Sequence, residues 1–203
     1  MTTERNKMKC LKFIIVSFLA IISCKQHSDS EHSNCQYFDK TSVDTSAADM
    51  LIAITDEDYL QYGARIAFVN ADKDTIIPYG KYTYLGSDTL KHYANVMVYK
   101  NDSLHGRFVA IDRNENILYD IVFFDNGPDY FHEGLVRVLR NGKMGFANKY
   151  GQVVIPCEYD FARRFKNGKA EVTYRATQFL DSEEHKQVLS DEWFQIDKSG
   201  NKI

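Results

Sequence analysis

The chain of 203 residues is poor in the residues that mark several protein classes. Its 3 prolines and 11 glycines are too few for a collagen-like or low-complexity chain. The 25 lysines and arginines are outnumbered by 28 aspartates and glutamates, and this net charge of −3 predicts that nucleic acid is not a partner. The four cysteines include no Cys-x2-Cys pair, the spacing typical of a metal site. A chain of this length does not need a metal or disulfides to fold.

Recognisable catalytic motifs are missing as well. The sequence contains no Gly-x-Ser-x-Gly elbow, no His-Glu-x-x-His pair and no glycine-rich phosphate loop. Glu183, Glu184 and His185 are neighbours in a polar stretch, where we expect solvated side chains rather than metal ligands. His132 and Glu133 fall in a recurring turn, where we expect a structural role. We therefore predict no catalytic residue, no metal and no cofactor.

The N-terminus has an apolar run that is too short to cross a membrane. Phe13–Ile22 is uncharged and follows a basic stretch, with translation starting at Met1 or at Met8. Ten helical residues reach about 15 Å, half of the hydrocarbon thickness. A basic stretch followed by a short apolar one is typical of a secretory signal peptide. The sequence therefore predicts a leader at residues 1–23.

Ile21-Ile22-Ser23-Cys24, at the end of the leader and the residue after it, resembles the lipobox of bacterial lipoproteins. The resemblance implies that Cys24 is lipidated and that this lipid is the membrane anchor. Lys25 after the cysteine favours the outer membrane by the same resemblance, and Asp29 and Glu31 are similar to an export signal of Bacteroidota-type lipoproteins. Several acyl chains on one cysteine give stable attachment, because each buried methylene contributes about 0.8 kcal/mol.

Residues 24–48 are rich in Ser, Thr, Asp and His and show no apolar period. We expect a flexible, polar and disordered tether between the lipid and the folded domain. Cys35 lies in this tether, and an oxidising envelope would allow it to pair with Cys157. Such a disulfide would pull the tether onto the domain, and the sequence leaves both states open.

From residue 49 onward the sequence indicates strands with an internal repeat. Four short apolar runs each end in an anchor residue that opens a turn, namely Asn70, Asp112, Asn148 and Asp197. A second apolar run follows the turn, and Gly151 and Gly200 stand where a tight hairpin needs positive φ. Pro78 and Pro156 occupy equivalent places in the second run and predict a strand end or an edge.

A third run in each copy alternates between apolar and polar residues, at Asn95–Tyr99, Leu135–Leu139 and Ala170–Tyr174. The predicted fold class is therefore all-β, with about three short antiparallel strands per repeat. Three repeats and a C-terminal half-repeat are expected to stack into a single array over residues 49–203. The half-repeat is expected to pair near Met50–Tyr62 and so cap or close the array. The expected core aromatics are Phe68, Phe108, Phe131, Phe146, Phe165 and Trp193.

Two motifs carry a resemblance to a known family. Gly142–Asp160, and the Phe-x-x-Gly element that begins at Phe131 and again at Phe165, resemble the WG repeat. Met144-Gly145 stands where that family has Trp-Gly, and Trp193-Phe194 keeps the tryptophan alone. The resemblance covers about residues 65–203 and implies an envelope or extracellular β-repeat protein. It transfers no catalytic residue.

These observations predict a non-enzymatic, lipid-anchored protein of the cell envelope, periplasmic or surface-exposed, whose repeat surface binds a protein or a glycan. Tyr82 and Tyr84 share one face of a strand and are the candidate binding surface, with packing inside the sheet as the competing interpretation. Two alternatives stay open. One is an envelope glycan hydrolase that uses paired carboxylates, and the other is a structural or immunity-type lipoprotein.

Overall fold

The computed structural model describes residues 36–42, 50–99, 105–124, 127–180 and 186–203. The chain divides into two units, Met1–His32 and Ser33–Ile203, and every described residue belongs to the second. The predicted leader, Cys24 and Cys35 lie outside the described residues, as do Glu183, Glu184 and His185. Within the described ranges, no helix suited to crossing a membrane is found.

The described residues fold into short strands and contain no helix, which confirms the all-β prediction. The strands are β1 (Leu51–Thr55), β2 (Arg65–Val69), β3 (Thr75–Tyr84), β4 (Thr89–Leu90), β5 (Ala94–Val98), β6 (Phe108–Ile111), β7 (Ile117–Ile121), β8 (Phe123–Phe124), β9 (Gly127–Pro128), β10 (Leu135–Arg140), β11 (Lys143–Asn148), β12 (Val153–Tyr159), β13 (Phe161–Ala162), β14 (Lys169–Thr173), β15 (Thr177–Leu180), β16 (Lys186–Leu189) and β17 (Phe194–Asp197). The runs predicted as third strands of the repeats form β5, β10 and β14.

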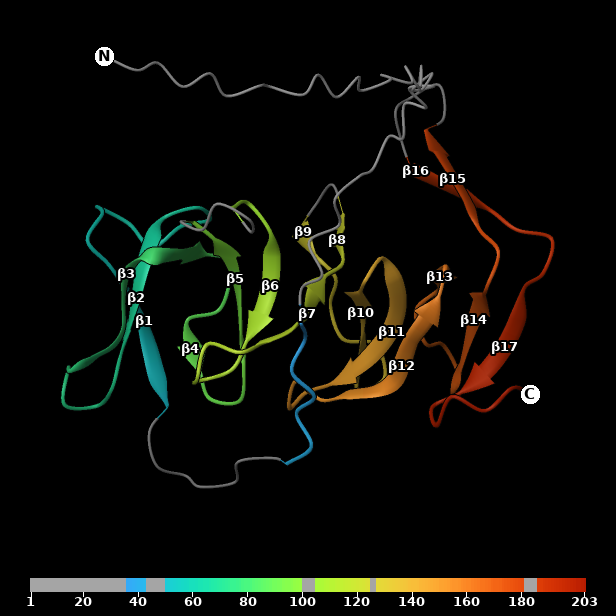
Figure 1. Cartoon of the computed structure of the whole chain (residues 1–203), viewed down its shortest axis with the longest axis horizontal. Coiled ribbons are helices and arrows are strands. Elements are labelled where there is room, and N and C mark those ends of the chain that lie inside the picture. The colour runs from blue at the N-terminus through green and yellow to red at the C-terminus, as the bar shows by residue number, and fades with distance from the viewer. Residues whose placement is uncertain (1–35, 43–49, 100–104, 125–126, 181–185) are drawn as a thin grey trace, which may run out of the picture. The chain divides into compact units, whose positions relative to one another are not determined.

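One ten-stranded antiparallel sheet holds most of the strands, in the order β12-β11-β10-β7-β6-β5-β3-β2-β1-β4. A three-stranded sheet, β13-β14-β17, follows it, and the pairs β8-β9 and β15-β16 are separate two-stranded sheets. In Figure 1 the colours of the domain run from the blue-green β1, β2 and β3 at one end, through the green and yellow strands, to the orange and red strands, with β17, at the other.

The pairing repeats from copy to copy. The first two strands of each copy form a hairpin, β2-β3, β6-β7 and β11-β12. The third strand then pairs with the first strand of the next copy, as β5-β6, β10-β11 and β14-β17. In the third copy β14 pairs with β13 rather than with β12, which ends the large sheet.

The ends of the array do not meet. The last strand, β17, pairs with β14, whereas β1 pairs with β2 and β4 at the other end of the chain. The expectation that the half-repeat would pair near residues 50–62 is therefore wrong. Among the described strands, every pair joins elements at most three places apart in the chain, so pairing over short sequence distances builds the array without closure.

All four anchor residues organise the same turn. The backbone N–H of the anchor bonds to the carbonyl four residues later, and the anchor side chain accepts the N–H of that same residue, in the turns at Asn70, Asp112, Asn148 and Asp197. The third residue after the anchor has positive φ, which Gly151 (φ 78°) and Gly200 (φ 84°) adopt without strain. Lys73 (φ 69°) and Glu115 (φ 63°) hold the same conformation in the first two copies.

The two repeat prolines lie at irregularities inside strands rather than at strand ends, and Pro156 lies in β12, an edge strand of the large sheet, as one of the two predicted alternatives has it. Pro78 falls between two paired positions of β3 where the register with β2 shifts, and Pro156 falls in the corresponding shift between β12 and β11. A bulge leaves residues of one strand unpaired, so the missing N–H of proline breaks no ladder hydrogen bond there.

The core is formed by the inward faces of the repeated strands, and three of the expected core aromatics, Phe68, Phe146 and Phe165, are buried. Phe131 is 40% exposed and is not a core residue, and Phe108 and Trp193 are half-buried. Phe165 packs edge-on against Phe146, with ring centroids 4.8 Å apart. In the preceding copy Ala110 stands in the place of Phe146, which leaves Phe131 without a ring there.

Residues 36–42, which fall in the segment predicted as a flexible tether, are docked on the domain. The backbone N–H of Phe38 bonds to the Ile117 carbonyl of β7 at 2.8 Å. The Tyr37 hydroxyl donates to Asp120 at 2.6 Å, and Asp39 forms an ion pair with Arg140. The part of the tether that the structure describes is thus tied to the middle of the large sheet.

Candidate binding site

The structure does not leave Tyr82 and Tyr84 as an exposed platform. Both rings lie on the face of β3 that covers the first core cluster, where Tyr82 is buried and Tyr84 is half-buried. The Tyr84 hydroxyl donates to Asp88, and its ring centroid lies 6.0 Å from that of Tyr62. Sharing one strand face was predicted correctly, but that face packs inward, so the binding-surface prediction is wrong for Tyr82.

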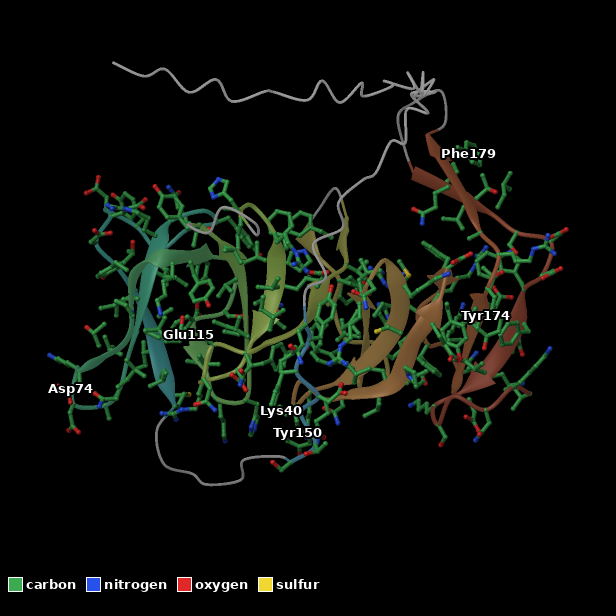
Figure 2. All side chains as sticks on the ribbon, viewed as in Figure 1. Lys40, Asp74, Glu115, Tyr150, Tyr174 and Phe179 are labelled. Carbon is green, nitrogen blue, oxygen red and sulfur yellow. The ribbon has the colours of Figure 1, made fainter. Side chains whose placement is uncertain are left out.

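A different aromatic surface lies at the C-terminal part of the domain, beside Tyr174 in Figure 2. It is a groove of about 420 Å³, which we call the aromatic groove, lined by Glu158, Tyr159, Tyr174, Glu192, Trp193, Phe194, Gly200 and Lys202. A larger cleft of about 590 Å³ at the base of the β15-β16 hairpin has no aromatic wall. The aromatic lining makes the aromatic groove the candidate for ligand recognition.

Three strands deliver the rings of the aromatic groove. Tyr159 ends β12, Tyr174 follows β14, and Phe194 begins β17, where it pairs with Val172. The centroids of Tyr159 and Tyr174 are 5.2 Å apart, and those of Tyr174 and Phe194 are 5.3 Å apart, each pair tilted by 34°. Tyr174 is 50% exposed, so part of this residue remains accessible to a ligand beside its two ring neighbours.

Polar groups border these rings. The Tyr174 hydroxyl donates to Glu158 at 3.0 Å, and the Lys202 ammonium lies 4.7 Å from the centroid of Phe194. Burial, followed by the nearby Tyr174 and Glu158, raises the pKa of Tyr159 to about 12. Burial and Glu158 also raise the pKa of Tyr174. Both phenols therefore remain neutral hydrogen-bond donors at physiological pH.

Sequence reasoning missed this groove because its rings are far apart in the chain. Tyr159 and Tyr174 belong to one copy, and Trp193 and Phe194 to the next. Their approach depends on the pairing of β14 with β17, which spans the β15-β16 insertion. The sequence did offer one signal. The C-terminal half-repeat is short, yet it places two large aromatic residues, Trp193 and Phe194, side by side.

An ion network around the buried Asp129 was also not predicted. The Arg137 Nε donates to Asp129 Oδ2 at 2.8 Å, and the Arg164 Nε donates to Asp129 Oδ1 at 2.9 Å. Arg137 also donates to the Ala162 carbonyl, so the network connects β10 with β13. Burial raises the pKa of the Asp129 carboxyl, but the hydrogen bond and charge of Arg137, followed by Arg164, outweigh it and lower the pKa below its ordinary value of 3.8.

Three other candidates from the sequence, His132, Glu133 and Cys157, show no arrangement for catalysis or metal binding among the described residues. His132 exchanges backbone hydrogen bonds with Leu135 across a two-residue turn, and Glu133 accepts the N–H of Gly168 in the next copy. Cys157 is a free thiol among the described residues, and burial raises its pKa to about 11, so it is unreactive at neutral pH. The described part of the chain contains no group of three or more metal-ligating side chains.

The recurring hairpins, the anchor turns and the Met144-Gly145 pair meet in one stretch of the chain. Residues 144–175 match the WG containing repeat. The matched WG repeat runs from β11 through β14 to Arg175, so it supplies Glu158, Tyr159 and Tyr174 to the aromatic groove. The groove is completed by residues that follow the WG repeat. No curated protein and no solved structure matches the chain.

Proposed function

We propose that this repeat protein is a non-enzymatic, lipid-anchored protein of the cell envelope whose aromatic groove binds a glycan. The observation that carries the proposal is the cluster of Tyr159, Tyr174 and Phe194 at the groove wall. Aromatic faces pack against the apolar faces of sugar rings, and tyrosine adds a hydroxyl for hydrogen bonding. Glu158 and Glu192 border the same groove and would accept hydrogen bonds from sugar hydroxyls.

Four carboxyl groups outside the aromatic groove are poor candidates for the general acid of a glycosidase. A glycosidase needs a general acid whose pKa is raised. The shifted carboxyl pKa values in the described residues are all lowered, by hydrogen bonds and cations around Asp129, Glu133, Asp160 and Asp197. These groups are ionised at neutral pH and would not donate a proton to a leaving group.

The anchor and the location are proposed from the lipobox-like Cys24, which would place the protein in the outer membrane of a bacterium of the Bacteroidota type. Docking of residues 36–42 limits the distance between the lipid and the domain, because at most residues 24–35 then separate the two. A fully extended chain of that length reaches about 40 Å. Replacing Cys24 with serine is expected to abolish labelling by a palmitate analogue and to release the protein from the membrane fraction. Retention of the label by the variant would refute the anchor.

The binding proposal is tested by screening the full-length protein in detergent against a glycan array, followed by titration of the best ligand. Tyr174→Ala is expected to weaken binding roughly tenfold, because it removes the partly exposed ring. Tyr59→Ala removes a tyrosine that is 75% exposed and lies outside the groove, so it should leave the affinity unchanged. An array without any bound glycan, or equal loss in both variants, contradicts the proposal.

A protein partner is the second candidate, and the β15-β16 hairpin favours it. This two-stranded sheet carries Phe179, which is 42% exposed, and Leu189, which is 62% exposed. Figure 2 shows Phe179 on the hairpin, away from Tyr174. Cross-linking in intact envelopes with a photoreactive amino acid in place of Phe179 should then capture a defined partner. A blank result there, combined with an empty glycan array, would reduce the protein to a structural role.

A further inference from the structure

A second groove is lined mainly by residues of the WG repeat. Cationic side chains predominate in it, whereas two carboxylates and one lysine line the aromatic groove. The second groove has a volume of about 530 Å³ and is lined by Arg163, Arg164, Lys166, Asn167, Lys169, Ala170, Glu171 and Gln195. We call it the basic groove, because four cationic side chains line it and one carboxylate opposes them. In a chain with a net charge of −3, such a concentration of positive charge is a local property of this repeat.

Two of these cations, Lys166 and Lys169, occupy positions where their like charges destabilise the fold. Lys166 and Lys169 are directly paired across a two-residue turn, with the Lys166 N–H bonded to the Lys169 carbonyl at 2.8 Å. Like charges at directly opposite positions destabilise a strand pair. The preceding copy makes the same turn with His132 and Leu135 at these two positions. The turn therefore does not require lysines, and an anionic ligand would offset their repulsion.

The two arginines of the basic groove are held in place before any ligand arrives. The Arg164 guanidinium is fixed by Asp129 and stacks on the Tyr130 ring at 4.2 Å, with a hydrogen bond to the Tyr130 hydroxyl. The Arg163 guanidinium stacks on the Trp193 ring at 4.8 Å and lies 3.3 Å from Glu171. A planar guanidinium held in this way binds carboxylate, sulfate or phosphate oxygens with little loss of side-chain entropy.

The basic groove adjoins the aromatic groove at Trp193. Trp193 lines the aromatic groove, and Arg163 of the basic groove covers its ring. Phe194 lines the aromatic groove and Gln195 the basic one, and successive side chains of a strand point to opposite faces. The two grooves therefore lie on opposite faces of the β14-β17 sheet and meet beside Trp193, where β17 begins. A chain of several sugar units would contact both grooves by passing around Trp193.

We infer that the ligand is an acidic glycan, whose sugar ring stacks in the aromatic groove while its carboxylate, sulfate or phosphate groups bind Lys166, Lys169 and the adjacent arginines. The inference rests on the proposed function and adds the charge class of the ligand. A flat anionic membrane is a poorer fit, because the cations line a concave groove beside an aromatic one rather than spreading over an exposed face.

The test compares an oligogalacturonate with its full methyl ester, which removes the negative charges and adds one methyl group to each sugar, by titration against the full-length protein in detergent. A sulfated oligosaccharide forms a third arm and separates sulfate from carboxylate recognition. The acid is expected to bind about tenfold more tightly than the ester at low ionic strength, with the difference reduced at high salt as screening shortens the range of the charges. The double variant Lys166→Gln, Lys169→Gln should lower the affinity for the acid to that for the ester.

The matched control is Lys91→Gln, which removes an exposed lysine that lies outside both grooves. It should leave the preference for the acid intact. Equal affinity for acid and ester, with binding still lost in Tyr174→Ala, would overturn the acidic-ligand inference and leave the proposed function standing. Preference for an acidic probe that survives the double lysine variant would overturn the assignment to the basic groove. Binding of none of the three probes would also overturn the inference, whereas the glycan array decides the proposed function.

Discussion

At the scale of single residues, Gly145 shows why the second position of the WG pair is small. A β-carbon built on Gly145 would lie 2.5 Å from the Ile155 carbonyl oxygen and 2.8 Å from the Cys157 backbone nitrogen. Both are backbone atoms of β12, at the bulge where its register with β11 shifts. Because a backbone does not yield as a flexible side chain does, this glycine is required by close approach rather than by its φ angle.

We predict that Gly145→Ala destabilises the domain by about 2–3 kcal/mol, the upper part of the roughly 1–3 kcal/mol found for overpacked cores. Urea unfolding followed by fluorescence would measure the change. Ala67 occupies the same place in the first copy, and Ala67→Gly is the control, with an expected loss of about 1 kcal/mol from backbone entropy. A Gly145→Ala protein as stable as the parent would show that β12 can move away.

The anchor residues make a second prediction at this scale. Asp112 is buried and accepts the N–H groups of Asn114 and Asn116, both at 2.9 Å. Asp112→Ala should lower the free energy of unfolding by about 2 kcal/mol, since these donors lose their partner. Asp112→Asn should have little effect, because asparagine fills the same role in two other copies. Chemical denaturation of both variants checks this, and equal losses would contradict the hydrogen-bond account.

At the scale of elements, the hairpins of the repeat differ from the β15-β16 hairpin. The repeat hairpins contribute buried residues to the three core clusters, whereas none of the described side chains of β15 and β16 belongs to one. The β15-β16 pair also joins no larger sheet. It is therefore an insertion between β14 and β17 that the fold does not depend on.

Replacing residues 177–189 with a short Gly-Ser turn is expected to leave the melting temperature nearly unchanged, because the change falls outside the core. Removal of residues 193–203 is the contrasting variant, since it takes away the fully buried Ile196 together with the strand pairing of β17. That truncation should lower the melting temperature strongly. Similar melting curves for the two deletions would refute the distinction.

At the scale of the whole domain, the Asp129 network connects the large sheet with the three-stranded one, and it makes stability depend on pH. The pKa of Asp129 is lower in the folded state than its ordinary value of 3.8. The stabilisation is therefore complete above that value and is lost as the pH falls through the lowered folded-state pKa. Asp160 and Asp197 have lowered pKa values as well and act in the same direction.

We predict that the urea midpoint is constant from pH 7 to about pH 5 and falls steeply below pH 4. Breaking the buried pair by Asp129→Asn should cost about 3–5 kcal/mol at pH 7, because Arg137 is left without its carboxylate. The same variant should show a weaker acid dependence than the parent, measured as the difference in midpoint between pH 7 and pH 3. An unchanged dependence would place the acid-sensitive groups elsewhere.

Much of the fold was predictable because its signals are local. The anchors Asn70, Asp112, Asn148 and Asp197 bond to backbone groups within four residues, so the turns they form can be read from short windows. Alternation in the third runs likewise identified β5, β10 and β14. Burial of individual aromatics was less predictable. Phe131 and Phe165 share a motif, but Phe165 packs against Phe146, whereas Ala110 occupies the corresponding position for Phe131.

The sequence by itself determined the all-β class, the repeated hairpins and the turn chemistry, since each depends on residues that are close in the chain. Tertiary structure alone decided that β17 pairs with β14, that residues 36–42 dock on β7 and β10, and that Tyr82 faces the core. It also decided the two grooves, which combine side chains from β12, β14 and β17 and the turns beside them. The physical reason is that alternation places a side chain on one of two faces, while only the packing of neighbouring strands determines which face meets solvent.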